Sequence, residues 1–320
     1  ERVFALKDGT LTSSLNLDAD RYQRNHTGAI LAFELIPGDP TTMLLGSEYT
    51  PERAAALRES LGLDRNVFVR FFDWLTAFVR GDMGTSYSYA MPVGEVLRGK
   101  IAVTSVLSLM SWVLVIGISV PLGVALVRYQ NKPFGKIGVW VNQIMMAIPP
   151  FFLGILLTYL FGLVLNLFTP GRFVPLAESV WGCLRYLFFP ALAISIPKIA
   201  KTVKLLRSSI LGEMKRDYVL TAYSRGNSRW TVIKNHVFRN ALLPVVTYLA
   251  MSLADIVASS IIVEQVFVVP GLGRLLVASI SNRDYPVALC IVVMIASVVV
   301  VMNYLADILT QAVDPRVRLN

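Results

Sequence analysis

Five long apolar stretches restrict this chain to one class of fold. The stretches cover residues 101–127, 137–168, 181–199, 242–263 and 287–309. About 20 apolar residues in a helix cross the hydrocarbon core of a bilayer, and a helix satisfies its own backbone polar groups where water is absent. Hydrophobic residues make up 55% of the chain and charged residues 16%, whereas soluble domains carry about 25% charged residues. We predict an all-α polytopic membrane protein with five full spans.

The first 40 residues predict an incomplete additional span. Residues 1–27 are polar and lack the basic and apolar regions of a signal peptide. Residues 28–40 are apolar but short, contain Glu34, and end in a Pro-Gly-Asp-Pro turn. We therefore expect an atypical polar N-terminus followed by a partial first span.

Residues 41–100 carry mixed charge and predict an external, soluble helical cap. Thr50 followed by Pro51 is typical of a helix start, and this helix is expected to run to about Gly62. A second, amphipathic helix is predicted by the helical spacing of aromatic residues, and it should end at Gly81. These aromatic residues are Phe68, Phe71, Phe72, Trp74 and Phe78.

The positive charge of the chain is concentrated between two apolar stretches. From Lys198 to Arg239 there are ten Lys and Arg residues and two acidic residues, which accounts for +8 of the net charge of +9. Such a cluster next to spans marks a cytoplasmic connection and argues against a nucleic-acid-binding protein. Residues 198–241 are named the coupling region, and we place residues 101–320 in one transmembrane domain with a cytoplasmic C-terminus.

The coupling region contains signals for short helices. Asp217 is expected to cap a helix that Gly226 ends, and Ser228 is expected to cap the next one. Trp230, Ile233 and Val237 share a face of that next helix. Before these helices, four basic residues recur at a spacing of three and either meet lipid phosphates or form a solvated face. They are Lys198, Lys201, Lys204 and Arg207. A short helix held crosswise suits either docking of a partner or contact with lipid alone.

Few residues could support chemistry. The sequence contains no Gly-x-x-x-x-Gly-Lys-Ser/Thr phosphate loop, and its two histidines and two cysteines predict no catalytic or metal site. Cys183 and Cys290 are expected to be small packing residues. Gly271 and Gly273 predict a tight turn in which glycine adopts a positive φ.

Asp255 is the one acidic residue well inside a predicted span. A charge there costs on the order of 3 kcal/mol and should face the bundle interior or water, so Asp255 is either a pathway residue that meets a cationic amine or a structural partner of another helix. Pro149-Pro150 breaks its span and is a second candidate for the pathway. Glu264 and Asp307, near span ends, are expected to be interfacial.

Residues 220–226 resemble a motif of a known family. They read Leu-Thr-Ala-Tyr-Ser-Arg-Gly and resemble the Glu-Ala-Ala-x-x-x-Gly signature of permease subunits of bacterial ABC importers, with Leu220 and Thr221 in place of its first two residues. Leu243-Pro244 lies farther from Gly226 than in the general signature, which is similar to the dipeptide/oligopeptide/nickel branch. Further motifs similar to that branch are Pro37-Gly38-Asp39-Pro40, Leu61-Gly62-Leu63-Asp64, Gly81-Asp82-Met83-Gly84, Arg207-Ser208-Ser209, Asp217-Tyr218-Val219, Arg239-Asn240-Ala241-Leu242-Leu243-Pro244, Val263-Glu264-Gln265-Val266-Phe267, Pro270-Gly271-Leu272-Gly273-Arg274, Arg283-Asp284-Tyr285-Pro286 and Asp314-Pro315-Arg316.

The resemblance implies a permease subunit of an ATP-driven importer of di- or oligopeptides in the bacterial inner membrane. It implies a second homologous permease, two ATPase subunits, an extracytoplasmic solute-binding protein and surrounding lipid as partners. The chain itself would bind no cofactor and carry no ATPase site, because the partner subunits use the ATP. The residues expected to contact the ATPase are Asp217, Tyr218, Thr221, Ala222, Tyr223, Arg225 and Gly226.

Three alternatives remain open on the sequence. The first is a permease for nickel or another small solute, although no cluster of Met, His or Cys favours a metal. The second is an ion-coupled carrier or channel that needs no ATPase. The third, a membrane-bound enzyme, is disfavoured because no acid, base and nucleophile set converges.

Overall fold

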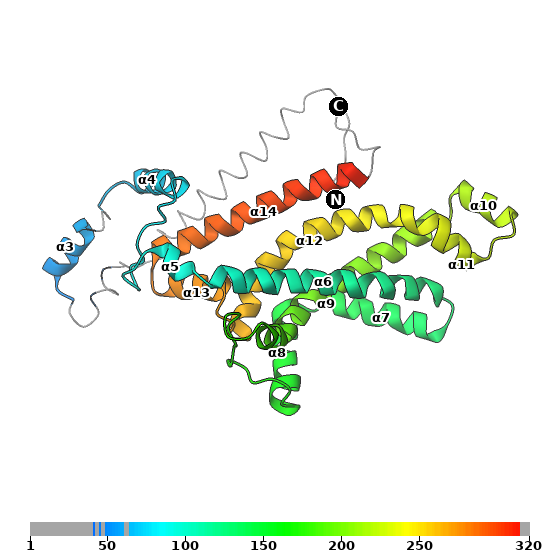
Figure 1. Ribbon diagram of the computed structural model, residues 1–320, viewed down its shortest axis with the longest axis horizontal. Helices are drawn as coiled ribbons and strands as arrows, with labels where there is room; N and C mark the ends of the chain where they lie inside the picture. Colours follow the sequence, from blue (N-terminus) through cyan, green and yellow to red (C-terminus); the bar gives the residue numbers. More distant parts are fainter. Residues whose placement is uncertain (1–40, 42–44, 46–48, 61–63, 314–320) are drawn as a thin grey trace, which may run out of the picture. The chain divides into compact units, whose positions relative to one another are not determined.

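The computed structural model describes residues 41, 45, 49–60 and 64–313, and the regular elements of this part are helices (Figure 1). They are α3 Pro51–Ser60, α4 Val67–Val79, α5 Val93–Leu97, α6 Lys100–Arg128, α7 Pro133–Ala147, α8 Pro150–Leu157, the π-helix η2 Thr158–Val164, α9 Val180–Glu213, α10 Asp217–Ser224, α11 Arg229–Val232, the π-helix η3 Ile233–Val237, α12 Phe238–Val266, α13 Leu272–Ser281 and α14 Tyr285–Val313. Strand pairing in these residues is limited to one isolated bridge between Thr85 and Pro92. The all-α prediction is therefore confirmed for the described residues, whereas the predicted partial span at 28–40 and the polar residues 1–27 lie outside them.

Four described helical stretches are long and apolar enough to cross a membrane. They are Val93–Arg128, Val180–Glu213, Arg229–Val266 and Tyr285–Ile308. The pair Pro133–Ala147 and Pro150–Val164 passes the same test together, which gives up to five spans if this bent pair is one crossing. Each predicted stretch thus coincides with a helix or a broken pair of helices.

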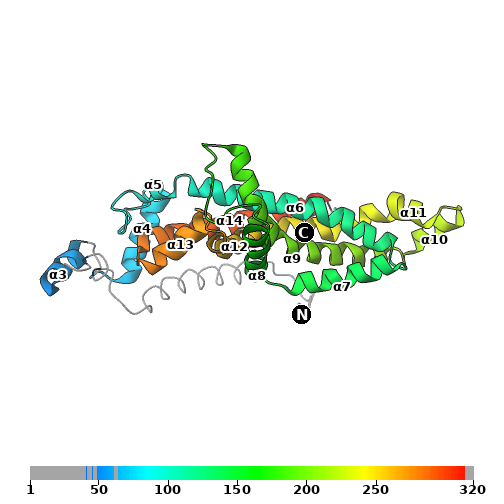
Figure 2. The same ribbon diagram turned by 90° about the horizontal axis from the view of Figure 1, so that it is seen from below.

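The break predicted at Pro149-Pro150 is confirmed and turns the chain by 104° (Figure 2). Ile148 and Pro149 both have extended backbones, and Pro150 is the first residue of α8. A residue before proline avoids the helical region, and proline itself offers no N–H to the preceding turn. Two consecutive prolines therefore end α7 and allow α8 to begin at once in a new direction.

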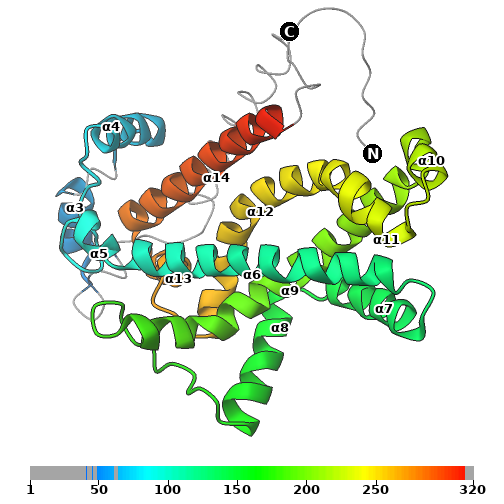
Figure 3. The ribbon, with the colours of Figure 1, turned by 45° about the vertical axis from the view of Figure 1, so that its right-hand side comes forward.

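Helix α9 is longer than the predicted span at 181–199. It continues to Glu213 and contains Pro190 and Pro197 without a break. It packs against α6, α7, α8 and α12, and Figure 3 shows these helices gathered along it. Its inward face is buried over most of its length, so α9 is the central helix of this bundle.

The described residues up to Val93 form one compact unit together with Asn282–Pro286. In this unit the buried carboxylate of Asp284 accepts hydrogen bonds from the hydroxyl of Ser86 and from the backbone N–H groups of Tyr87 and Ser88, the latter two at 3.1 and 3.2 Å. Charge-assisted bonds of this kind hold the 86–88 loop to a segment almost 200 residues later in the chain.

The predicted helices of the same unit are also present. The Thr50 hydroxyl accepts from the N–H of Arg53 at 3.3 Å, which confirms the start of α3. Helix α4 ends at Val79, two residues before Gly81, which has a positive φ of 93°. Beyond the predicted amphipathic helix, the antiparallel bridge leads to α5.

The second unit comprises Gly94–Ser281 and the residues from Val287 onward, and a buried polar cluster organises one end of it. The Glu264 carboxylate of α12 is fully buried and accepts from the Thr104 hydroxyl of α6 at 2.7 Å. It also accepts from the N–H groups of Gly273 and Arg274 at 2.7 and 3.2 Å, while Thr104 accepts from the N–H of Leu272 at 2.8 Å. Two other helices thus cap the first turn of α13, whose N–H groups have no partner within their own helix.

This cluster corrects two predictions. Glu264 is not interfacial, because it is fully buried and accepts hydrogen bonds from Thr104 of α6 and from two N–H groups of α13. Gly271 and Gly273 do not adopt a positive φ; instead they allow close approach. A Cβ on Gly271 would lie 2.5 Å from the Glu264 carboxyl carbon, and one on Gly273 would lie 2.9 Å from the Ile261 carbonyl oxygen.

We predict that Gly273→Ala destabilises the chain by about 1–3 kcal/mol, the usual cost of overpacking. The added methyl would push α13 from α12 and disturb the bonds to Glu264. The measurement is the thermal unfolding midpoint of the purified chain in detergent.

Gly117→Ala is the matched control, because Gly117 is also helical and a Cβ there meets no atom within 4 Å. Alanine should be neutral or slightly stabilising at this position. Equal midpoints for the two variants would show that the contact at Gly273 does not constrain the fold.

Candidate functional site

Helix α10 begins and ends close to the predicted positions. Gly226 has a φ of +78°, and its N–H donates to the Tyr223 carbonyl at 2.8 Å, which confirms its role as the residue that ends the helix. The prediction that Asp217 caps the start is wrong. Arg216 is the extended residue before the helix, and Asp217 is the first helical residue, where its charge favours the positive helix end.

The two faces of α10 differ sharply. Val219 and Ala222 are buried in a core cluster with Val232, Ile233 and Val237. Leu220 is 65% exposed on the opposite face. Of the predicted contact residues, the structure exposes Asp217, Tyr218, Thr221, Tyr223, Arg225 and Gly226, whereas Ala222 packs inward. The sequence did not predict Leu220 as a contact residue. On a helix of eight residues, buried and exposed positions are hard to assign without knowing what the helix packs against.

A hydroxyl group ties α10 to its neighbours. The Tyr218 hydroxyl donates to the Glu213 carboxylate at the end of α9 at 2.8 Å and accepts from the Asn240 amide of α12 at 3.4 Å. Burial raises the pKa of Tyr218 above its ordinary value; the bond from Asn240 opposes this shift and the bond to Glu213 adds to it. The hydroxyl therefore stays protonated, and remains a donor, throughout the neutral pH range.

Helix α11 forms the other side of the region that contains α10. The Ser228 hydroxyl accepts from the N–H of Thr231 at 3.3 Å, as predicted for a capping residue. Ile233 and Val237 are buried, and Trp230 receives the guanidinium of Arg128, from the end of α6, at 4.8 Å over its ring. In Figures 1 and 3, α10 and α11 lie at the end of the bundle where α6 leads into α7. The short helices are therefore seated on the ends of longer ones.

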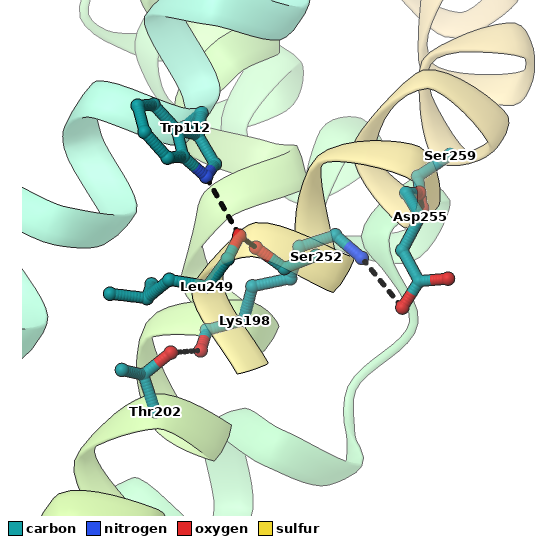
Figure 4. A network of polar contacts seen from close by, with 7 residues as sticks. All are labelled: Trp112, Lys198, Thr202, Leu249, Ser252, Asp255 and Ser259. Carbon is teal, nitrogen blue, oxygen red and sulfur yellow. Dashed lines mark hydrogen bonds and ion pairs between the residues drawn. The ribbon is translucent and has the colours of Figure 1, made fainter. Parts of the chain in front are cut away.

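An ion pair joins α9 to α12 within the apolar helices. The Lys198 ammonium lies 3.9 Å from the Asp255 carboxylate, and Figure 4 shows the two groups pointing toward one another. The Lys198 side chain is 12% exposed and that of Asp255 is 65% exposed. Beside the pair, the Trp112 indole donates to the Leu249 carbonyl at 2.9 Å, which links α6 to α12. Sequence spacing alone could not pair these residues, since they belong to different helices.

Asp255 belongs to a stripe on α12 that no described helix covers. Met251, Asp255, Ala258 and Ile262 recur at helical spacing, and all four are exposed. Three of them are apolar, as expected for a surface that meets lipid or another helix. The carboxylate is the exception, because a charge is costly in lipid.

Comparison with known proteins assigns the chain to a family. The model of the binding-protein-dependent transport system inner membrane component matches residues 117–319, and the model of the N-terminal part of such components matches residues 27–113. The chain belongs to this family. The first match contains both the α10 segment and the Lys198–Asp255 pair, and the two matches confirm the resemblance to ABC importer permeases.

Three named proteins of transport systems are similar to this permease. The oligopeptide transport system permease protein AppB of Bacillus subtilis is 34% identical over 297 residues, which cover 90% of this chain and 93% of AppB. The glutathione transport system permease protein GsiC of Salmonella typhi is 31% identical over 293 residues, 91% of this chain and 93% of GsiC. A Brucella abortus protein named for a peptide transport system is 34% identical over 293 residues, with coverage of 91% and 93%.

A solved structure supports the fold of the permease. The chain resembles a subunit of the MetNI methionine ABC transporter in an inward-facing conformation, with a TM-score of 0.54, 18% identity, and coverage of 68% of this chain and 96% of that chain. At this identity the likeness concerns the fold alone.

We predict that Tyr218→Phe loosens α10. Loss of the bond to Glu213 and of the longer bond from Asn240, together about 1 kcal/mol, should increase the opening equilibrium of the α10 amides about fivefold. Because the raised pKa keeps Tyr218 protonated until alkaline pH, its contribution is complete below the ordinary tyrosine pKa and is lost only as the pH rises through the raised value. The increase should therefore be the same at pH 6 and pH 8, as measured by hydrogen exchange.

Tyr223→Phe, at an exposed tyrosine of the same helix, is the control and should leave the exchange of α10 unchanged. Similar effects of the two substitutions would contradict a specific tie through Tyr218.

Proposed function

We propose that this permease is the membrane-spanning subunit of an ATP-driven importer of di- or oligopeptides, and that α10 is its contact with a separate ATPase. The observation that carries the proposal is that α10 has one exposed, partly apolar face, whereas its other face packs into the core. The names of AppB and the Brucella relative support a peptide substrate. The absence of a phosphate loop from the sequence agrees with an ATPase on another subunit.

The packing of α10 supports transfer of force to the spans. Val219 and Ala222 share a core with α11 and η3, and this segment continues without interruption into α12. Tyr218 adds direct ties to Glu213 and Asn240. A closely packed core transmits displacement rather than absorbing it, so movement of α10 by a closing ATPase would shift α9 and α12. ATP would thereby favour one of two packings of the spans.

The exposed carboxylate of Asp255 supports a pathway beside α12. A charge in lipid is costly, so the stripe of α12 that contains Asp255 would face water or a second permease, not hydrocarbon. A peptide's cationic amine would replace or share Lys198 as the partner of Asp255. The sharp break at Pro149-Pro150 supports a bend of the spans around the same pathway.

The subunits expected to assemble with this permease are those of its family. A second homologous permease, two ATPase subunits and an extracytoplasmic solute-binding protein would complete the importer in the bacterial inner membrane. The basic coupling region argues for a cytoplasmic α10 and C-terminus. Residues 41–100 would form the external cap, and the α7–α8 pair would count as one of five full spans.

We predict that Leu220→Glu weakens binding of the ATPase at least about tenfold, as expected for an apolar anchor at the centre of an interface. Leu220 is exposed, so the substitution should not disturb the fold. The measurement is binding of the purified cognate ATPase to the permease, together with ATP-dependent uptake.

Asn235→Glu introduces the same charge at an exposed position of η3 and serves as the control. Gly226→Asp should also weaken binding, because Gly226 has a positive φ that other residues rarely adopt. Normal binding and uptake in both Leu220→Glu and Gly226→Asp would remove the proposed contact.

We also predict that Asp255→Asn impairs uptake of peptides with a free amino terminus. Loss of a charged hydrogen bond of about 1.5–3 kcal/mol should raise the KM roughly 10- to 100-fold. Peptides with an acetylated amino terminus should be affected little, because they offer no cation. The measurement is uptake into vesicles that contain the complete importer.

Ser259→Ala is the neighbouring control, since the Ser259 hydroxyl donates only to the Asp255 backbone carbonyl among the groups described. Equal uptake of free and acetylated peptides by the wild type, or unchanged uptake in Asp255→Asn, would exclude recognition of the amine at this position.

A further inference from the structure

A pocket of about 370 Å³ lies between α6, α7 and α9, apart from both α10 and Asp255. Its lining combines apolar side chains of all three helices with Trp140 of α7 and with Lys204 and Arg207 of α9. At the same place, the Asn142 amide donates to the Ala200 carbonyl at 2.9 Å and joins α7 to α9. The pocket is thus bounded by packed helices and carries two positive charges.

The charges in this pocket have no acidic partner among the residues that the structure describes. Neither Lys204 nor Arg207 forms an ion pair there, and the buried Nε of Arg207 has no hydrogen-bond partner. Two acidic groups on α9 and α12 are engaged elsewhere: Glu213 bonds Tyr218 and Arg216, and Asp255 pairs with Lys198. A buried donor without a partner is unfavourable, so the pocket is suited to an anion.

The position of the pocket along α9 matches the headgroup zone of a bilayer. Trp181 is exposed near the start of α9, where tryptophan is typical of a membrane interface. From Trp181 to Lys204 the helix rises about 35 Å at 1.5 Å per residue, close to the roughly 30 Å of the hydrocarbon core. Lys204 and Arg207, one turn farther on, therefore reach the opposite interface.

An apolar surface continues from the pocket along α7. Trp140 is 74% exposed, and Ile137, Val141 and Ile144 are exposed at helical spacing on the same side. Such a surface fits acyl chains, whereas a free anion would use only the basic end. The arrangement of cations, an interfacial aromatic ring and an apolar strip is that of a lipid site.

The geometry points to an anionic phospholipid as the occupant of this pocket. Its phosphate diester accepts hydrogen bonds from Lys204 and from the forked guanidinium of Arg207, which suits phosphate oxygens. Trp140 covers the glycerol region, and the acyl chains follow Val141 and Ile144. This site does not depend on the peptide substrate or on the ATPase contact. It would brace α9 about two turns before Glu213, the residue that holds Tyr218.

The test is native mass spectrometry of the complete purified chain titrated with phosphatidylglycerol or phosphatidylcholine. Phosphatidylglycerol should bind more tightly, and the double variant Lys204→Gln, Arg207→Gln should bind it roughly 30-fold more weakly, given the usual contribution of two basic residues near an anionic surface. Phosphatidylcholine binding should not change. Lys204→Arg keeps the charge and should retain the preference.

The double variant Lys201→Gln, Lys215→Gln is the matched control, because it removes two charges of the same basic segment from residues that do not line the pocket. An equal loss in this control would mean that only the general surface charge attracts lipid, and would overturn the site. Full displacement of the lipid by inorganic phosphate would identify a free-anion site instead. Unchanged binding of phosphatidylglycerol by the double variant Lys204→Gln, Arg207→Gln would likewise overturn the site.

Discussion

The hydrocarbon core of a membrane offers no hydrogen bonds, so each polar group in this permease must find its partner within protein or at an aqueous surface. Glu264 meets this demand with three donors from α6 and α13, and Lys198 and Asp255 meet it by pairing across α9 and α12. These contacts determine which helices lie together. A substitution that removes one partner leaves the other polar group buried without a partner. The free-energy cost then includes disturbed packing of the helices as well as the lost bond.

Helix α9 connects the features on which the proposals rest. It carries Lys198 in the middle of the bundle, Lys204 and Arg207 at the lipid pocket, and Glu213 at the contact with α10. A continuous helix is stiff on the scale of one domain, even with Pro190 and Pro197 inside it. Motion that begins at α10 would therefore reach Asp255 and the lipid pocket through one element, and a bound lipid would influence the same motion.

The errors of the sequence predictions have identifiable physical causes. Asp217 was expected to cap α10, but the extended backbone of Arg216 starts the helix one residue earlier, and propensity does not resolve such shifts. Glu264 was expected at the interface because it lies near the end of an apolar stretch. It is buried because α13 turns back and presents its unpaired N–H groups. Pro149-Pro150 was predicted correctly as a break, since the constraint on backbone angles is local, although the angle of 104° depends on packing.

The sequence by itself determined the apolar helices, the break at the two prolines, the end of α10 at Gly226 and the concentration of basic residues in the coupling region. All of these follow from local composition, backbone preference or the energy of transfer into lipid. Only the tertiary structure decided which polar groups meet, because Thr104 and Glu264 are 160 residues apart and Lys198 and Asp255 lie on different helices. It also decided that Leu220 faces outward and Ala222 inward, since a helix of eight residues presents several faces and only its packing against α11 selects one.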